Sequence, residues 1–271
     1  MSKRQLKNII FSGGGFKGWA YIGTIKALNE TIEFKNIEHI IGVSIGSVFS
    51  LFYILKIDPQ FILNNFLNSD LKSFFDIDLD SVIINQSIIE GLKYKNRILD
   101  IVKGKINTTT TFIELYNLTG ILYTTCAFNI DNNSLDYFNK DLTPDIKVID
   151  AIMASSALPI LFPSYKINGD YYYDGGICNN CPCNLVDPSV SIAFNMKSID
   201  NKSEYKLFNL ILSITNNLNK LYIKNEEIIF DLVDSKFDNE VYNLNQSSET
   251  IFNLYMNGYK NTLRILTQQN F

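Results

Sequence analysis

The chain has 271 residues, of which 46% are hydrophobic and 19% are charged. This length suffices for one large α/β domain or two small ones, with a sizeable core. The formal net charge is −4. A nucleic-acid-binding protein presents a basic face, so we expect no nucleic-acid partner. The negative charge also argues against holding an anionic membrane by charge alone.

The N-terminus predicts no signal peptide, because the basic residues 1–7 precede only a short apolar run, 8–11. The longest uncharged apolar run, 40–55, is shorter than a membrane span. We therefore expect a soluble, cytoplasmic protein, with at most peripheral membrane contact. Four cysteines do not make a disulfide framework in a chain of this size.

The first part of the chain repeats a strand followed by a helix. Residues 7–11 predict a buried strand, the glycine-rich segment 12–18 follows, and 19–28 show a helical pattern. Residues 37–41 predict a second strand, and 47–55 have the length of a helix. This order predicts a βαβ unit with parallel strands. The loops after the two strands then lie at adjacent carboxyl ends, where α/β sheets bind ligands.

The rest of the chain predicts further elements of an α/β fold. Residues 60–117 suggest several short helices over one end of the sheet. The other expected elements are a strand at 121–129, a turn at 131–134 with a returning strand at 135–138, a helix at 148–156, a hairpin at 165–173 that turns at Asn168-Gly169, a strand at 189–194, helices at 205–223 and 248–266, and a strand at 228–233. Residues 198–271 contain no functional motif.

The glycine-rich loop fits an anion site better than a nucleotide site. Its glycines, Gly13, Gly15 and Gly18, match the dinucleotide fingerprint, but that fingerprint needs an acid at the end of the second strand, and Glu38 is at the wrong end. A P-loop needs Gly-Lys-Ser/Thr, whereas Trp19 follows Gly18. Backbone N–H groups at a helix start bind anions. Beside a nucleophilic serine, that anion is the oxyanion of a tetrahedral intermediate. A dinucleotide site and a plain turn remain the alternatives.

The segment Gly42-Val43-Ser44-Ile45-Gly46 lies between the second strand and its helix. This is the arrangement of a nucleophile elbow. The turn is so tight that it needs glycine on both sides of the serine, and it places the hydroxyl at a helix N-terminus. A plain strand-to-helix turn is the alternative.

A nucleophilic serine needs a base, and His39 is the only histidine. It lies five residues before Ser44 in the same strand, so their Cα atoms are about 16 Å apart. A Ser-His-Asp triad is therefore excluded within one chain. Either Ser44 is inert, or a carboxylate serves it directly. Asp174 is the best candidate, because Gly175 and Gly176 allow its loop to approach another backbone. A simple turn after the hairpin is the alternative.

Three motifs in this order resemble the patatin-like phospholipases: Gly13-Gly14-Gly15-x-Lys17-Gly18, Gly42-x-Ser44-x-Gly46 and Asp174-Gly175-Gly176-x-x-x-Asn180-x-Pro182. The segment 154–163 resembles the stretch that precedes the family's aspartate. The resemblance covers about residues 6–190. It implies a three-layer α/β/α sandwich with a central, mostly parallel sheet. We expect a single domain over 1–271, with 198–271 as its C-terminal helical extension.

The resemblance also implies a Ser-Asp dyad, which agrees with the argument from the histidine. Ser44 is then the nucleophile and Asp174 the base. The other residues implied are Gly13, Gly14 and Gly15 as oxyanion donors, Lys17 at the family's basic position, and Gly42, Gly46, Gly175 and Gly176 in support. The expected activity is that of a lipid acyl hydrolase of the phospholipase A type, which needs no metal or cofactor.

Several alternatives stay open. An acyltransferase would use the same acyl-enzyme, and a lipid-binding protein could keep the fold without turnover. The expected partners are a membrane lipid or another fatty-acyl ester, with an activating protein as a further candidate. The helices of 60–117 could build a lid or an acyl-chain channel. Cys178, Cys181 and Cys183, with Cys126, could hold zinc, but no second C-x-x-C accompanies them, so we expect reduced thiols.

Overall fold

The computed structural model describes residues 4–67, 87–196, 218–219, 222, 224–243 and 245–271. One sheet runs in the order β5-β6-β3-β2-β1-β7-β8, and β4 pairs with β3. Neighbours from β3 to β8 are parallel, whereas β4, β5 and β6 run antiparallel to their partners. The strands are β1 (Asn8–Phe11), β2 (His39–Gly42), β3 (Leu122–Asn129), β4 (Ser134–Phe138), β5 (Tyr165–Ile167), β6 (Asp170–Asp174), β7 (Ser191–Asn195) and β8 (Ile229–Asp231).

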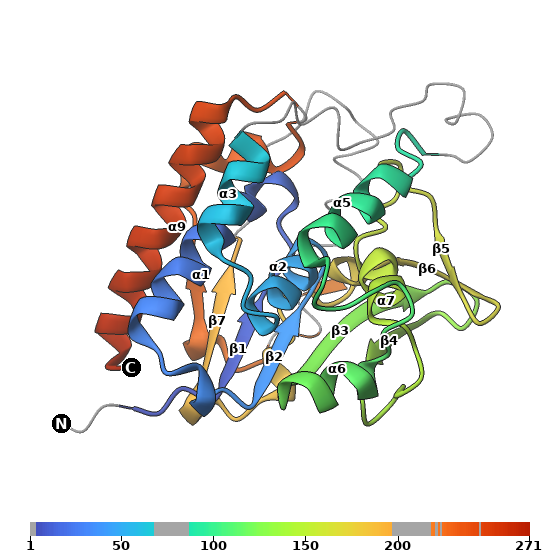
Figure 1. The fold of residues 1–271 in the computed structure, drawn as a ribbon, viewed down its shortest axis with the longest axis horizontal. Coiled ribbons are helices and arrows are strands. Elements are labelled where there is room, and N and C mark those ends of the chain that lie inside the picture. The colour runs from blue at the N-terminus through green and yellow to red at the C-terminus, as the bar shows by residue number, and fades with distance from the viewer. Residues whose placement is uncertain (1–3, 68–86, 197–217, 220–221, 223, 244) are drawn as a thin grey trace.

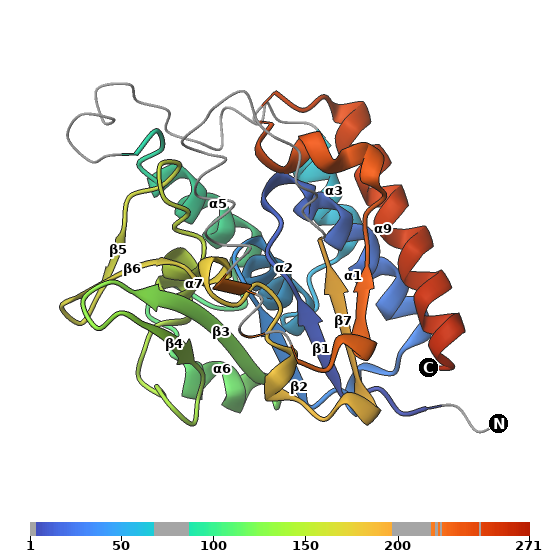
Figure 2. The ribbon, with the colours of Figure 1, turned by 180° about the vertical axis from the view of Figure 1, so that it is seen from behind.

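Helices flank this sheet, so the predicted fold class of a mostly parallel central sheet with flanking helices is confirmed. Helices α1, α2, α3 and α9 lie in front of the strands in Figure 1, and Figure 2 shows the sheet from behind. The α-helices are α1 (Ala20–Thr31), α2 (Ile45–Ile54), α3 (Pro59–Leu67), α5 (Leu92–Val102), α6 (Phe112–Thr119), α7 (Val148–Ser155) and α9 (Ser248–Gln269). The short 3₁₀ helices are η1 (Gly15–Trp19), η2 (Phe34–Asn36), η4 (Gly175–Ile177), η5 (Cys183–Leu185), η6 (Pro188–Val190), η7 (Glu226–Ile228) and η8 (Ser235–Tyr242).

Most of the helix expected at 205–223 lies outside the described residues. Among the helices that are described, none combines the length and the apolar character that a membrane span needs.

The central strands are buried on both faces. In β1, Ile9 and Phe11 belong to the large core, whereas Ile10 belongs to a smaller cluster with Ile41 and Ile228. Successive side chains of a strand point to opposite faces, so the two clusters lie on opposite sides of the sheet. This explains why the strands are continuous apolar runs rather than alternating ones.

The C-terminal helix α9 packs directly along α1. A Cβ atom on Gly23 of α1 would lie 2.0 Å from the Tyr255 carbonyl oxygen, and one on Gly258 of α9 would lie 2.0 Å from the Ala20 carbonyl oxygen. The two backbones therefore touch where each helix has no side chain. The last helix of the chain is thus part of the packing around the first βα unit.

The hairpin β5–β6 brings Asp174 to the sheet. Its turn residues Asn168 and Gly169 both have positive φ, 51° and 110°. An Asn-Gly pair suits such a two-residue hairpin turn, so the predicted hairpin is confirmed. Strand β6 then pairs with β3, with Asp174 opposite Ala127.

Candidate active site

Ser44 lies in a strained turn between β2 and α2. Its φ of 54° and ψ of −129° are rare for a residue with a side chain, and such strain is typical of functional sites. Its N–H donates to Ser155 Oγ at 2.9 Å, and its carbonyl oxygen accepts from Ser47 Oγ at 2.5 Å. These bonds hold the serine backbone from two sides.

The flanking glycines are required by close backbone contacts. A Cβ atom on Gly46 would lie 2.2 Å from the Phe11 carbonyl oxygen, and one on Gly42 would lie 2.6 Å from the Gly46 carbonyl oxygen. Any larger residue would push α2 away from the end of β1. Glycine is therefore needed at both positions for the turn to place Ser44 at this edge of the sheet.

Ser44 and Asp174 are in direct contact. Ser44 Oγ donates to Asp174 Oδ2 at 2.5 Å, and Asp174 Oδ1 accepts from the Gly176 N–H at 2.7 Å. The Asp174 side chain is buried, with only 3% of the residue exposed. Burial raises the pKa of Asp174 from 3.8 to about 7, although the bonds from Ser44 and Gly176 act in the opposite direction. The carboxyl group is therefore suited to exchange a proton near neutral pH.

The glycine-rich loop lies against the serine. A Cβ atom on Gly13 would lie 3.0 Å from Ser44 Cβ. The Gly13 N–H donates to the Asn180 carbonyl oxygen at 3.3 Å, and the Gly13 carbonyl oxygen accepts from Asn180 Nδ2 at 3.1 Å. Over the described residues, the amides of Gly14 and Gly15 make no hydrogen bond. These two N–H groups begin η1 and are available to an anion, whereas that of Gly13 is engaged.

Lys17 does not face solvent beside this loop. Its side chain is buried, and Nζ lies 3.3 Å from Asp238 Oδ1. Burial lowers the pKa of Lys17, and the nearby carboxylate of Asp238 opposes that effect. The lysine therefore contacts a residue from the C-terminal part of the chain.

A family model described as "Patatin-like phospholipase" matches residues 9–187, which is more than half of the chain. The chain belongs to the patatin-like phospholipase family. The family recognised from the three motifs is thus confirmed.

Two viral proteins are similar in sequence to this patatin-like chain. A probable lipid hydrolase, 463L, of Invertebrate iridescent virus 6 is 27% identical over 213 residues, which cover 76% of this chain and 70% of the relative. An uncharacterized protein, R571, of Acanthamoeba polyphaga mimivirus is 27% identical over 199 residues, which cover 69% of this chain and 63% of the relative. The family and the first of these relatives support lipid hydrolysis.

Solved structures share the patatin-like fold. VipD from Legionella pneumophila superimposes with a TM-score of 0.62 at 17% identity, over 99% of this chain and 68% of VipD. The ExoU–SpcU complex from the type III secretion system of Pseudomonas aeruginosa gives a TM-score of 0.54 at 16% identity, over 99% of this chain and 52% of the matched chain. The patatin-like chain thus spans about half to two thirds of the length of these proteins.

The His39 side chain of the patatin-like chain bonds a residue of β3 rather than Ser44. Its Nε2 lies 2.8 Å from Thr124 Oγ1 on β3, and burial lowers its pKa to about 4. The expected position of His39, in the strand that precedes Ser44, is confirmed. Ser44 bonds a carboxylate, Asp174, instead.

The Asp174 loop approaches two other segments through its glycines. A Cβ atom on Gly175 would lie 2.3 Å from the Cys126 carbonyl oxygen, and one on Gly176 would lie 2.6 Å from Asn180 Oδ1. This is the close approach for which the two glycines were expected.

Sequence reasoning gave no role to four residues that hold the site. Ser155 and Asn180 lie in segments that resemble the family, so the sequence marked their positions but not the bonds that they make. Asn219 accepts from the Asn180 N–H at 2.5 Å and donates from Nδ2 to the Gly176 carbonyl oxygen at 2.8 Å. Asn219 and Asp238 lie in a part of the chain without a motif, and no sequence signal pointed to them.

The cysteines are free thiols. Cys181 Sγ and Cys183 Sγ lie 3.6 Å apart, and burial raises the pKa of the Cys126 thiol. Across the described part of the chain, no three His, Cys, Asp or Glu side chains converge as a metal site requires. The zinc alternative thus has no ligand cluster in these segments.

An apolar pocket has Ile45, the residue after Ser44, in its lining. Helices α2, α3 and α5 and the end of η1 enclose it, with Trp19, Phe49, Phe66 and Ile98 among its lining residues. Helices α3 and α5 belong to the segment 60–117 that was expected to pack over one end of the sheet.

Proposed function

We propose that this protein is a lipid acyl hydrolase of the phospholipase A type, with Ser44 as nucleophile and Asp174 as base. The observation that carries the proposal is the 2.5 Å hydrogen bond from Ser44 Oγ to the buried Asp174 carboxyl group. Membership of the patatin-like phospholipase family supports a lipid ester as the substrate class.

The proposed reaction begins when Asp174 accepts the Ser44 proton and Oγ attacks the ester carbonyl carbon. The tetrahedral intermediate collapses to an acyl-serine, and the leaving alcohol or lysolipid takes the proton from Asp174. Asp174 then accepts a proton from water, which attacks the acyl-serine. Collapse of this second tetrahedral intermediate releases the fatty acid, and the proton returns from Asp174 to Ser44 Oγ. A pKa of about 7 makes Asp174 a stronger base than an ordinary aspartate while it remains ionised at mildly alkaline pH.

We assign the oxyanion to the amides of Gly14 and Gly15. Gly14 is the N-cap and Gly15 the first residue of η1. Neither amide has a hydrogen bond among the described residues, whereas the Gly13 amide already donates to Asn180. Gly13 instead allows the loop to lie against Ser44. Oxyanion stabilisation and positioning then supply most of the rate, because a carboxylate is a weak base for an alcohol.

We assign the acyl chain to the apolar side chains around Ile45. Val48, Phe52 and Ile101 line the same pocket. A fatty-acyl chain gains free energy by leaving water for such a site. Because the substrate resides in a lipid surface, the proposed enzyme contacts that surface peripherally.

A fluorophosphonate probe tests the dyad, because it reacts with an activated serine and leaves a phosphoryl oxygen where the oxyanion would lie. Wild type, Ser44→Ala and Asp174→Asn are incubated with the probe after circular dichroism has verified that each is folded. We expect an adduct on Ser44 by mass spectrometry in wild type, none in Ser44→Ala, and labelling of Asp174→Asn slower by at least about 100-fold. Labelling of Ser44→Ala at the wild-type rate would refute the assignment.

A further inference from the structure

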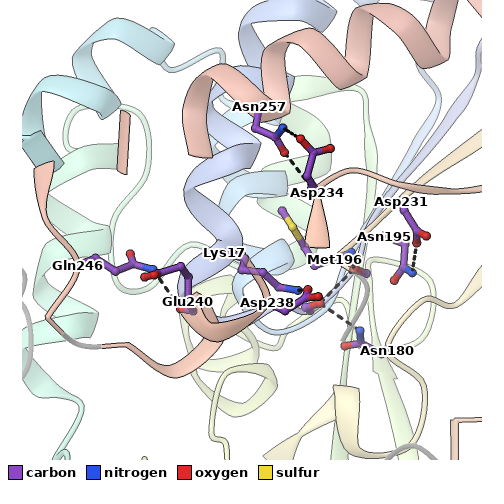
Figure 3. Close-up of polar contacts among 12 residues, drawn as sticks. Lys17, Asn180, Asn195, Met196, Asp231, Asp234, Asp238, Glu240, Gln246 and Asn257 are labelled. Atoms are coloured by element: carbon purple, nitrogen blue, oxygen red, sulfur yellow. Dashed lines mark hydrogen bonds and ion pairs between the residues drawn. The ribbon is translucent and has the colours of Figure 1, made fainter. Parts of the chain in front are cut away.

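The segment that follows β8 contacts the glycine-rich loop from outside the family match, which ends at residue 187. We propose that Asp238 is a positioning residue for the oxyanion site: its ion pair with Lys17 fixes η1, and with it the amides of Gly14 and Gly15. Figure 3 shows Lys17 and Asp238 facing each other. The inference rests on the proposed function, because it assigns Asp238 a part in the same reaction.

The ion pair is buried almost completely. The side chains of Lys17 and Asp238 are 1% and 5% exposed, and the two charged atoms lie 3.3 Å apart. Removing one member of such a pair leaves an uncompensated charge in the interior, which is far more unfavourable than removing both. Without Asp238, the buried Lys17 ammonium group loses the ion pair that joins it to η8. Lys17 follows Gly15 by two residues, so that loss releases the loop.

A second contact holds the other end of η1 to the same segment. Trp19 Nε1 donates to Gln246 Oε1 at 2.6 Å, and Gln246 Nε2 donates to the Glu240 carbonyl oxygen at 3.0 Å. Helix η1 is therefore bonded at Lys17 and at Trp19 to residues around η8. A single turn of 3₁₀ helix with two such contacts has little freedom to shift.

The segment that carries Asp238 is itself fixed to the framework. Asp234, at the start of η8, accepts from Asn257 Nδ2 at 2.6 Å and from Asn261 Nδ2 at 3.2 Å, both on α9. Strand β8, just before it, pairs with β7. Figure 3 shows the contact with Asn257 in the same view, above the Lys17 pair. Asp238 therefore has a rigid support from which to position Lys17.

The glycine end of the loop has separate supports. Gly13 is bonded to Asn180, and a Cβ atom on Gly14 would lie 2.4 Å from Met196 Cβ. These contacts fix Gly13 and Gly14 but involve no residue of η1. The direction of the Gly14 and Gly15 amides depends on the turn into η1, and this is the part that Lys17 and Asp238 hold.

Asp238→Asn tests the proposal, with Glu227→Gln, an exposed acid just before β8, as the matched control. On a soluble short-chain ester we expect Asp238→Asn to lower kcat by about 100-fold and to leave KM within about 2-fold, because a small misplacement of the oxyanion donors affects the transition state alone. Glu227→Gln should keep kcat within about 2-fold. A merely structural Asp238 would lower the melting temperature of Asp238→Asn and leave its kcat per folded molecule unchanged, which would overturn the proposal.

A double-mutant cycle tests whether Asp238 acts through Lys17. If it does, Lys17→Met/Asp238→Leu loses no more kcat than either single variant, about 100-fold. Multiplied losses would overturn the proposal. The double variant buries no charge, so it keeps the test valid if Asp238→Asn does not fold. A folded double variant with the wild-type kcat would also overturn it.

Hydrogen exchange gives a readout that needs no activity. The peptide covering residues 12–19 should exchange at least about 10-fold faster in Asp238→Asn and at the wild-type rate in Glu227→Gln. Unchanged exchange in Asp238→Asn would overturn the positioning role whatever the kinetics. Absence of fluorophosphonate labelling in wild type would instead refute the proposed function, and the exchange result would still decide whether Asp238 fixes the loop.

Discussion

Replacing Asp174 with asparagine should stabilise the protein at neutral pH while it abolishes the proposed catalysis. The unfolded chain ionises Asp174 near its ordinary pKa of 3.8, whereas burial raises the folded-state pKa to about 7. Between these two pH values the folded state holds a proton that the unfolded state has lost. The free energy of unfolding therefore falls as the pH rises from about 4 to about 7, and stays low above that.

The magnitude follows from the same two values. They differ by about 3 pKa units, and each unit corresponds to about 1.4 kcal/mol, so the ionised carboxyl group destabilises the folded protein by about 4 kcal/mol above pH 7. Asparagine has the same shape, does not titrate, and carries an amide that can donate to Ser44 Oγ while its oxygen accepts from Gly176. The stability of Asp174→Asn relative to wild type should therefore rise by about 4 kcal/mol between pH 4 and pH 8.

Urea denaturation of both proteins at several pH values measures this difference. Comparing the two proteins at each pH cancels the titration of every other group, because only residue 174 differs. Ser44→Ala serves as a companion, since removing the Ser44 hydrogen bond raises the pKa of Asp174 further. A stability difference that is flat with pH within about 1 kcal/mol, or that falls as the pH rises, would refute the argument.

Three further predictions follow from the geometry. The value of kcat/KM on a soluble ester should rise with pH through an apparent pKa of about 7, because Asp174 must be ionised to accept the Ser44 proton, and a flat profile from pH 5 to 9 would contradict its role as base. Gly258→Ala should lower the free energy of unfolding by at least about 3 kcal/mol, because its Cβ would lie 2.0 Å from the Ala20 carbonyl oxygen. Gly104→Ala, with no atom within 4 Å of its Cβ and a φ of 83°, should lose only about 1 kcal/mol. Equal losses in denaturation experiments would show that the close contact is unimportant. Ser155→Ala removes the acceptor of the Ser44 N–H and should lower stability by about 1–3 kcal/mol and slow fluorophosphonate labelling; unchanged stability and rate would show that this bond does not hold the turn.

The sequence predicted those parts of the fold that follow local rules. The first two strands were visible as apolar runs, the serine turn as two glycines around Ser44, and the hairpin as Asn168-Gly169. The pairing of Ser44 with Asp174 followed partly by elimination, since the strand spacing put His39 out of reach. The inferences about the strands, the serine turn and the hairpin each need only a few neighbouring residues.

Features that depend on distant contacts were not predictable. The glycine loop was expected to offer Gly13 as an oxyanion donor, but the partner of its amide is Asn180, which is 167 residues away. The pKa of Asp174 is raised by burial, which is a property of the packed site rather than of the Asp-Gly-Gly motif. Asp238 is an acid in a segment without a motif and looks in the sequence like a surface residue. Its burial depends on Lys17 at the other end of the chain.

The hydrogen bonds of the site also constrain the order in which the molecule acquires its reactive centre. Ser44 and Asp174 are 130 residues apart, Gly13 and Asn180 are 167 apart, and Lys17 and Asp238 are 221 apart. Contacts of such wide separation require closure of long loops and form late in folding. During synthesis, the strand and turn that carry Ser44 leave the ribosome long before the segments that complete its surroundings. A nascent chain from which Asp238 has not yet emerged therefore carries Ser44 without the segments that complete the site.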